Sequence, residues 1–147
     1  MSRIRVSAPR GRRVRLPERR VLLRRARRVL AELGARDAEL SLVLAADPEM
    51  AELNAHFRGR EGPTDVLSFS LLEGAGAEFR GGLLGDVVIG VEVAARQARR
   101  AGRSLDDEVA RLLIHGVLHL LGWDHERAAQ AKRMRAQERR LWRSLAG

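Results

Sequence analysis

The alternation of apolar and polar side chains along the sequence predicts four β-strands. Isoleucine and valine alternate with arginine near the N-terminus, which indicates a strand over about residues 2–8 with one basic face. Residues 40–45 form a nearly continuous apolar run, as in a buried strand. Residues 66–72 alternate, which predicts a strand with its leucines and phenylalanine buried and its serines facing away. A fourth strand is predicted over residues 83–89.

Apolar side chains at helical spacing predict four helices between and after these strands. Pro17 can open the first helix, Asp47 is interpreted as the N-cap of the second, and Gly122 ends the third. Because strands alternate with helices early and helices dominate late, the order predicts an α/β or α+β fold. The expected helices cover about residues 17–34, 47–58, 104–121 and 126–145.

Length and cysteine content limit the fold and its chemistry. A chain of 147 residues is expected to form a single domain over residues 1–147. It has no cysteine, which excludes disulfides, thiolate nucleophiles and cysteine-ligated metals. No apolar run reaches the roughly 20 residues of a membrane span, and the N-terminus lacks the apolar segment of a secretory signal. We therefore expect a cytoplasmic protein with no membrane partner.

Arginine dominates the charged residues of the chain. The sequence holds 28 basic and 19 acidic residues, a net charge of +9, and only Lys132 is a lysine. Both ends, residues 1–36 and 96–147, are basic, whereas residues 37–95 are acidic. Arginine favours planar, bidentate contacts with phosphate, so a nucleic acid is a candidate partner. A codon bias toward arginine is the competing explanation.

The first and the last predicted helix each have a basic face. Either face can be a solvated surface or a contact surface for ribose phosphates. Aromatic residues make up only 3% of the chain, so an RNA would be held through its phosphates, with salt-sensitive and weakly sequence-specific binding. The basic residues are Arg20, Arg24, Arg27 and Arg28 on the first helix and Lys132, Arg135, Arg139 and Arg143 on the last.

Three of the four histidines fall within eleven residues, at His115, His119 and His125. The first two are four apart on a predicted helix and therefore share one face. Gly122 permits a sharp turn, which would let His125 fold back as a third ligand. Three neutral imidazoles leave a tetrahedral Zn²⁺ with one open position, the arrangement of a catalytic site. We expect one Zn²⁺ per chain, and another divalent transition metal would also accept imidazole ligands.

The residue after the first histidine of this motif separates it from zinc proteases. Metzincin proteases read H-E-x-x-H-x-x-G-x-x-H, with the same histidine spacing. Their glutamate is the general base that acts on the zinc-bound water. This chain has Gly116 at that position, so peptide hydrolysis by the same mechanism is disfavoured.

At this segment the sequence resembles a known family. Residues 115–125 read H-G-V-L-H-L-L-G-W-D-H, which is similar to the signature H-G-x-L-H-L-x-G-Y-D-H of the YbeY family of bacterial ribosomal-RNA maturation endoribonucleases. Trp123 stands where tyrosine is usual. Residues 53–58 (L-N-A-H-F-R), 64–69 (T-D-V-L-S-F) and 84–89 (L-G-D-V-V-I) resemble further blocks of the family, in the same order along the chain.

The resemblance implies a mixed sheet of about four strands flanked by helices, with the metal-binding helix across it. It implies a metal-dependent endoribonuclease that cuts single-stranded RNA, matures the 3′ end of 16S rRNA and acts in ribosome quality control. Its partners would be rRNA and the small ribosomal subunit with its proteins, with no DNA. The family's metal-ligand role falls on His115, His119 and His125, and its substrate-handling role on Arg58.

The residues themselves leave several roles open. Arg58 precedes a glycine-containing loop, where its guanidinium can either stabilise charge on a phosphate or form a salt bridge with Glu61. His56 is interpreted as a surface histidine. Asp124 can orient a ligand histidine or cap the turn.

The sequence is also compatible with a second function. Because no general base is evident in the motif, a non-catalytic ribosome-assembly factor with a structural metal is the alternative to the nuclease.

Overall fold

The computed structural model describes residues 3–9, 13–72, 82–123 and 127–146. Four strands and five helices follow one another along these segments. Within them, no helix is long and apolar enough to cross a membrane. The elements are β1 (Arg3–Ser7), α1 (Arg19–Glu32), β2 (Ala38–Ala45), α2 (Asp47–Arg58), β3 (Val66–Ser70), β4 (Gly82–Gly90), α3 (Val91–Ala101), α4 (Leu105–Leu120) and α5 (Ala128–Ala146).

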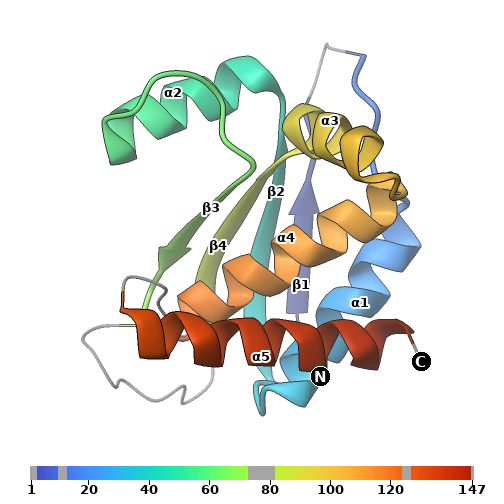
Figure 1. Ribbon diagram of the computed structural model, residues 1–147, viewed down its shortest axis with the longest axis vertical. Helices are drawn as coiled ribbons and strands as arrows, with labels where there is room; N and C mark the ends of the chain where they lie inside the picture. The colour runs from blue at the N-terminus through green and yellow to red at the C-terminus, as the bar shows by residue number, and fades with distance from the viewer. Residues whose placement is uncertain (1–2, 10–12, 73–81, 124–126, 147) are drawn as a thin grey trace.

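The four strands form one mixed sheet in the order β1-β2-β4-β3 (Figure 1). β1, β2 and β4 are parallel, and β3 pairs antiparallel with β4 at the edge. Helix α4 crosses one face of the sheet, and α5 and α1 lie over the same side (Figure 1). The expected α/β architecture with a mixed four-stranded sheet is therefore confirmed.

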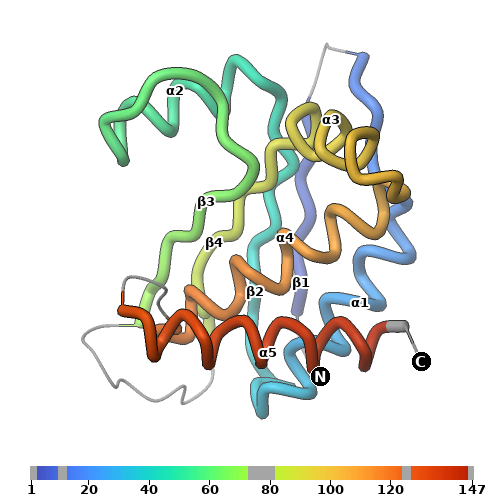
Figure 2. The backbone as a smooth tube through the Cα atoms, in the orientation of Figure 1, coloured from blue at the N-terminus to red at the C-terminus, as the bar shows by residue number. Residues whose placement is uncertain are grey.

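The sheet has a different core on each face. Leu42, Leu44 and Ile89 belong to the large core that α1, α4 and α5 complete. On the other face, Leu67 and Val88 meet α2 in a much smaller cluster. The tube in Figure 2 shows α2 set apart from α4 and α5. The sheet is thus deeply covered on the α4 side and thinly covered on the α2 side.

The alternation at the N-terminus is confirmed. In β1, Arg3 and Arg5 are exposed, whereas Ile4 and Val6 pack against the large core. The strand pairs in parallel with β2, so its basic side belongs to the sheet face that α1, α4 and α5 leave uncovered.

The sequence pattern does not predict helix α3. Its first residues, Val91 and Val93, continue the β-branched pattern of β4 without a break. Its N-cap, Gly90, has no side chain to cap the helix, so no start signal precedes it. The expected N-cap of α2 is also wrong: Ala46 occupies that position, and Asp47 begins the first turn, where it accepts hydrogen bonds from Arg96.

The expected one-sided burial of β3 is confirmed only in part, since Leu67 is buried and Ser70 is exposed, whereas Phe69 and Ser68 are both half-buried. Its serine side faces α4, where Ser68 Oγ donates to the carbonyl of Gly116 at 3.0 Å and Ser70 Oγ to that of Leu120 at 2.9 Å. Leu71 lies beyond the strand and is 56% exposed. The pattern does not predict these contacts, because a serine hydroxyl can face a helix wherever the helix backbone supplies an acceptor.

The close approach of α4 to the sheet depends on two glycines. A Cβ atom at Gly116 would lie 2.6 Å from Val87 Cγ1 and 3.2 Å from Ser68 Oγ. A Cβ at Gly85 would lie 2.1 Å from the carbonyl oxygen of Phe69 in β3 and 3.0 Å from Leu120 Cδ2 of α4, and Gly85 also has a φ of +146°. Together these glycines allow the helix backbone to reach the serines of β3.

Candidate metal centre and the cavity beside it

His115 and His119 lie together on α4, as their spacing predicts. Their Nε2 atoms are 3.1 Å apart and their ring centroids 4.6 Å apart. Both side chains are half-buried, whereas their neighbours Ile114, Gly116 and Leu118 are buried. The helix is therefore buried around most of its circumference, and the two imidazoles lie together on the strip of α4 that stays partly exposed.

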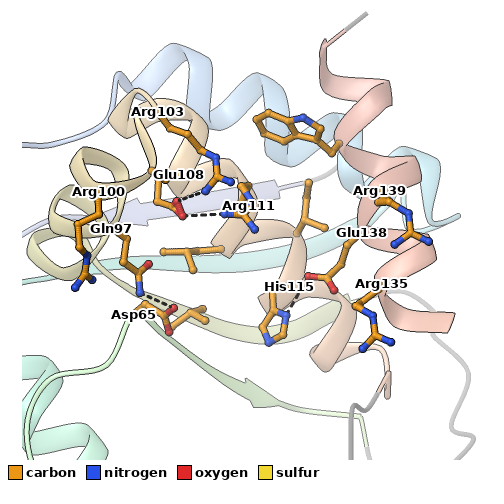
Figure 3. A pocket seen from close by; sticks show the side chains of 15 residues that line it. Asp65, Gln97, Arg100, Arg103, Glu108, Arg111, His115, Arg135, Glu138 and Arg139 are labelled. Carbon is orange, nitrogen blue, oxygen red and sulfur yellow. Dashed lines mark hydrogen bonds and ion pairs between the residues drawn. The ribbon is translucent and has the colours of Figure 1, made fainter. Parts of the chain in front are cut away.

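Glu138 of α5 orients the first histidine. Its Oε2 lies 3.2 Å from His115 Nδ1, a separation at which a protonated Nδ1 donates to the carboxylate (Figure 3). The hydrogen bond from His115 lowers the pKa of Glu138, and burial opposes this effect. A proton on Nδ1 leaves the lone pair of His115 on Nε2, the atom that faces His119.

The geometry of the pair fits a metal ligand set. Two nitrogens bound to one tetrahedral zinc lie about 3.3 Å apart, given zinc–nitrogen bonds of about 2.0–2.1 Å. The observed 3.1 Å between the two Nε2 atoms is close to this value. Two unprotonated Nε2 atoms at that distance repel each other unless a cation or a shared proton lies between them, so the donor set suits a divalent ion.

The third expected ligand, His125, lies outside the described residues, as does Asp124. Within the described segments, no group of three or more histidine, aspartate or glutamate side chains is arranged to hold a metal. The three-histidine site, with its Zn²⁺, therefore stays a prediction for which the structure supplies two of the three residues.

The turn expected after α4 is present. Gly122 has a φ of +92°, its N–H donates to the carbonyl of His119, and the N–H of Trp123 donates to that of Leu118. These two bonds form a Schellman motif, which reverses the chain after a helix. The chain is thus turned back immediately before His125, as the proposed ligand role requires.

Gly116 has a structural role of its own. Its position on α4 faces Val87 and the sheet, away from the two imidazoles. A glutamate there would collide with β4, so this helix has no room for the protease general base. The absence of that glutamate is therefore built into the packing of the helix.

Arg58 stands apart from the histidine pair. It is exposed at the last turn of α2, just before Gly59, which ends the helix with a φ of +63°. Within the described residues it does not line the cavity beside His115. The expected proximity of Arg58 to the metal stays a prediction.

Two neighbours of Arg58 on α2 make defined contacts. Asn54 is buried, and its Nδ2 donates to the carbonyl of Gly62 at 2.9 Å, which ties the loop to the helix. His56 is exposed, as expected, and its ring packs edge-on against Phe57 at 4.6 Å.

A cavity of about 880 Å³ lies beside His115, between α3, α4 and α5. Figure 3 shows Gln97 and Arg100 of α3 on one side, Arg135, Glu138 and Arg139 of α5 on the other, and His115 between them on α4. Apolar side chains complete the lining: Val66, Ala101, Leu112, Ile114 and Trp142. An apolar lining with a few converging polar groups is the usual make-up of a ligand site.

A buried carboxylate organises part of this cavity. Glu108 is 3% exposed and accepts hydrogen bonds from Arg103 at 3.3 Å and from Arg111 at 3.2 Å. Gln97 Nε2 donates to Asp65 Oδ2 at 3.2 Å, which links α3 to the start of β3. The cavity wall is therefore held by ion pairs and hydrogen bonds between elements distant in sequence.

Sequence reasoning missed Glu138 and treated the basic residues of α5 as one face. Glu138 is 23 residues from His115, and no local spacing connects two helices across a turn. The signal was present only as an acidic residue within an otherwise basic amphipathic helix.

Comparison with known proteins places the chain among the YbeY proteins. The family model described as Endoribonuclease YbeY matches residues 15–146. Endoribonuclease YbeY from Anaeromyxobacter sp. (strain Fw109-5) is 50% identical over 125 residues, which is 85% of this chain and 64% of that protein. The chain thus spans a little under two thirds of the length of this relative.

Other relatives are covered more completely. Endoribonuclease YbeY from Syntrophotalea carbinolica is 45% identical, over 80% of this chain and 79% of its own length. The solution structure of TM1509 from Thermotoga maritima aligns with 99% of this chain and 89% of its own, with a TM-score of 0.65 and 25% identity. Fold, histidine motif and sequence agree, and the chain belongs to the YbeY endoribonuclease family.

Proposed function

We propose that the chain is a metal-dependent endoribonuclease for single-stranded RNA, which matures the 3′ end of 16S rRNA on the small ribosomal subunit in the cytoplasm. The observation that carries this proposal is the pair of Nε2 atoms 3.1 Å apart, one of them oriented by Glu138 and adjoining an arginine-lined cavity. Family membership supplies RNA as the substrate class.

The proposed metal ligands are His115, His119 and His125, and Zn²⁺ is the ion that suits them best. Zinc bound there would supply Lewis-acid activation of water near neutral pH. Glu138 would hold the proton on Nδ1 of His115, so that the lone pair of Nε2 stays available to bind the metal. The packing of α4 on the sheet fixes both imidazoles before a substrate arrives.

Arginine side chains would handle the substrate. Those that line the cavity are placed to bind phosphates beside His115. Arg58 would approach the reacting phosphate from α2 and stabilise the negative charge that it gains in the transition state. The loop that Asn54 ties to α2 would set the direction of that approach.

The test is single-turnover cleavage of an end-labelled RNA that carries the 3′ region of 16S rRNA, compared with the same sequence in a duplex. Wild-type protein should cut the single strand and spare the duplex. A folded His119→Ala variant should lose both cleavage and metal, whereas His56→Ala, at an exposed histidine of α2, should retain both. Cleavage by a metal-free, folded His119→Ala variant would contradict the proposal, and RNA binding without any cleavage would favour the assembly factor.

A further inference from the structure

The basic face of α5 is divided by the structure into two parts. Lys132, Arg135, Arg139 and Arg143 follow one another at helical spacing and are all exposed. Arg135 and Arg139 line the cavity beside His115, whereas Lys132 and Arg143 do not. The helix therefore presents two arginines to the cavity and two further cations, one lysine and one arginine, outside it.

Three arginines of the cavity have no acidic partner among the described residues. Arg103 and Arg111 are held by the buried Glu108. The side chains of Arg100, Arg135 and Arg139 make no ion pair or hydrogen bond within the described segments, although they line the same cavity. The cavity lining holds five arginines and three carboxylates (Asp65, Glu108 and Glu138), so it keeps an excess of positive charge, and an anionic ligand would lower the energy of this arrangement.

The rest of the lining indicates which anion fits. Trp142, Leu112 and Ile114 give the cavity an apolar surface, and Trp142 is half-buried there. A ligand that satisfies both parts has spaced negative charges and a flat, weakly polar group. RNA has this combination, since its phosphates pair with guanidinium groups and its bases stack on aromatic rings.

We propose that the cavity between α3, α4 and α5 binds the RNA strand on one side of the reacting phosphate. Arg100, Arg135 and Arg139 contact successive phosphates, and Trp142 packs against a base. This inference rests on the proposed nuclease function, because it takes RNA as the substrate. It adds a definite strand path, from the histidine pair along α4 toward Trp142, and it assigns no such role to Lys132 and Arg143.

The test measures binding without cleavage. A labelled single-stranded RNA is titrated in the presence of a chelator, at several salt concentrations, and its anisotropy gives the Kd. Arg135→Ala combined with Arg139→Ala should weaken binding at least about tenfold, because two charge-assisted contacts are lost. The slope of log affinity against log salt should become shallower by about 1.4. The matched control, Lys132→Ala with Arg143→Ala, removes the same charge from the same helix and should keep the wild-type slope and Kd within about twofold.

A spectroscopic measurement tests the role of Trp142 without removing its ring. The chain has two tryptophans, so Trp123→Phe leaves Trp142 as the only one. In this variant, whose cavity arginines are unchanged, RNA should quench the fluorescence of Trp142. A ribose-phosphate oligomer without bases should not quench it. Unchanged fluorescence on saturating RNA would remove Trp142 from the strand path.

The variant with Arg135→Ala and Arg139→Ala is called the cavity pair, and the variant with Lys132→Ala and Arg143→Ala the control pair. The inference would be overturned if both pairs weakened RNA binding equally, or if the cavity pair bound RNA as tightly as the wild type. Cleavage assays then separate this failure from a failure of the proposed function. Wild-type cleavage by the cavity pair together with unchanged Kd would refute the cavity and leave the nuclease intact. A third outcome is that the cavity pair loses RNA binding, the control pair keeps it, and the wild-type protein cuts no RNA. This outcome would support the cavity and refute the nuclease.

Discussion

The two faces of the sheet hold their candidate functional groups in different ways. On the α4 face, a large core lies beneath the histidine pair, and Glu138 reaches His115 from a second helix. On the α2 face the buried cluster is small, and Phe57 is 57% exposed beside the exposed Arg58. The comparison shows that the metal candidates are fixed by tertiary contacts, whereas Arg58 is positioned by a helix end and its loop.

Removal of a histidine from the α4 face should have the largest effect. His115→Ala or His119→Ala removes one of two donor nitrogens that lie 3.1 Å apart, so metal content measured by mass spectrometry should fall from about one ion per chain to near zero. Chelation of the wild type should lower its melting temperature, because a metal bound to the folded state stabilises it. His56→Ala is the control, and loss of metal from that variant would contradict the assignment.

Arg58→Ala tests whether the α2 face takes part in the chemistry. A fixed donor to transition-state charge is worth about 10²–10³ in rate, so single-turnover cleavage should fall by that factor. Because the side chain is exposed, metal content and melting temperature should stay at wild-type values. Arg58→Lys should restore little activity, since an ammonium cannot make the planar two-donor contact. Near-normal cleavage by Arg58→Ala would leave the two faces functionally separate.

Glu138→Gln tests the contact that joins α5 to the histidine pair. Loss of a carboxylate that orients a ligand histidine should weaken metal affinity about 10–100-fold, with the fold retained. Competition with a chromophoric chelator measures this affinity. Gln137→Ala, a change at the adjacent position of α5, provides the control. An unchanged affinity in Glu138→Gln would show that the position of His115 depends on α4 alone.

Gly116→Ala should change the stability of the fold and not the ligand groups, and the sign of the change is diagnostic. In an ordinary helix this change stabilises by ~0.5–1 kcal/mol. Here the new Cβ would lie 2.6 Å from Val87 Cγ1, so we expect a loss of ~1–3 kcal/mol in the free energy of unfolding. Urea denaturation measures it. A gain in stability would mean that α4 can move away from the sheet at little cost.

The sequence predicted correctly those features that depend on residues a few positions apart. The histidines of α4 are one helical turn apart, and Gly122 adopts the positive φ that its position suggests. Helix α3 was missed because its first turn continues the pattern of β4 and has no capping side chain.

Contacts between distant elements could not be predicted in the same way. The serine side of β3 was expected to face away, but its hydroxyls donate to carbonyls of α4, and those carbonyls leave no trace in the sequence pattern. The same holds for Glu138 and for the cavity arginines, which three helices bring together.

The serine contacts of β3 have a consequence for how the proposed ion would bind. Leu120 contributes a carbonyl from the last turn of α4, which has no partner within the helix, and Ser70 supplies one. Ser68 anchors the same helix one turn earlier, at Gly116. His115 and His119 are therefore carried by a segment that is tied to the sheet at Gly116 and at Leu120. We expect repeated addition and chelation of Zn²⁺ to leave this part of α4 in place, so that its two histidines would bind the proposed ion without refolding of the helix.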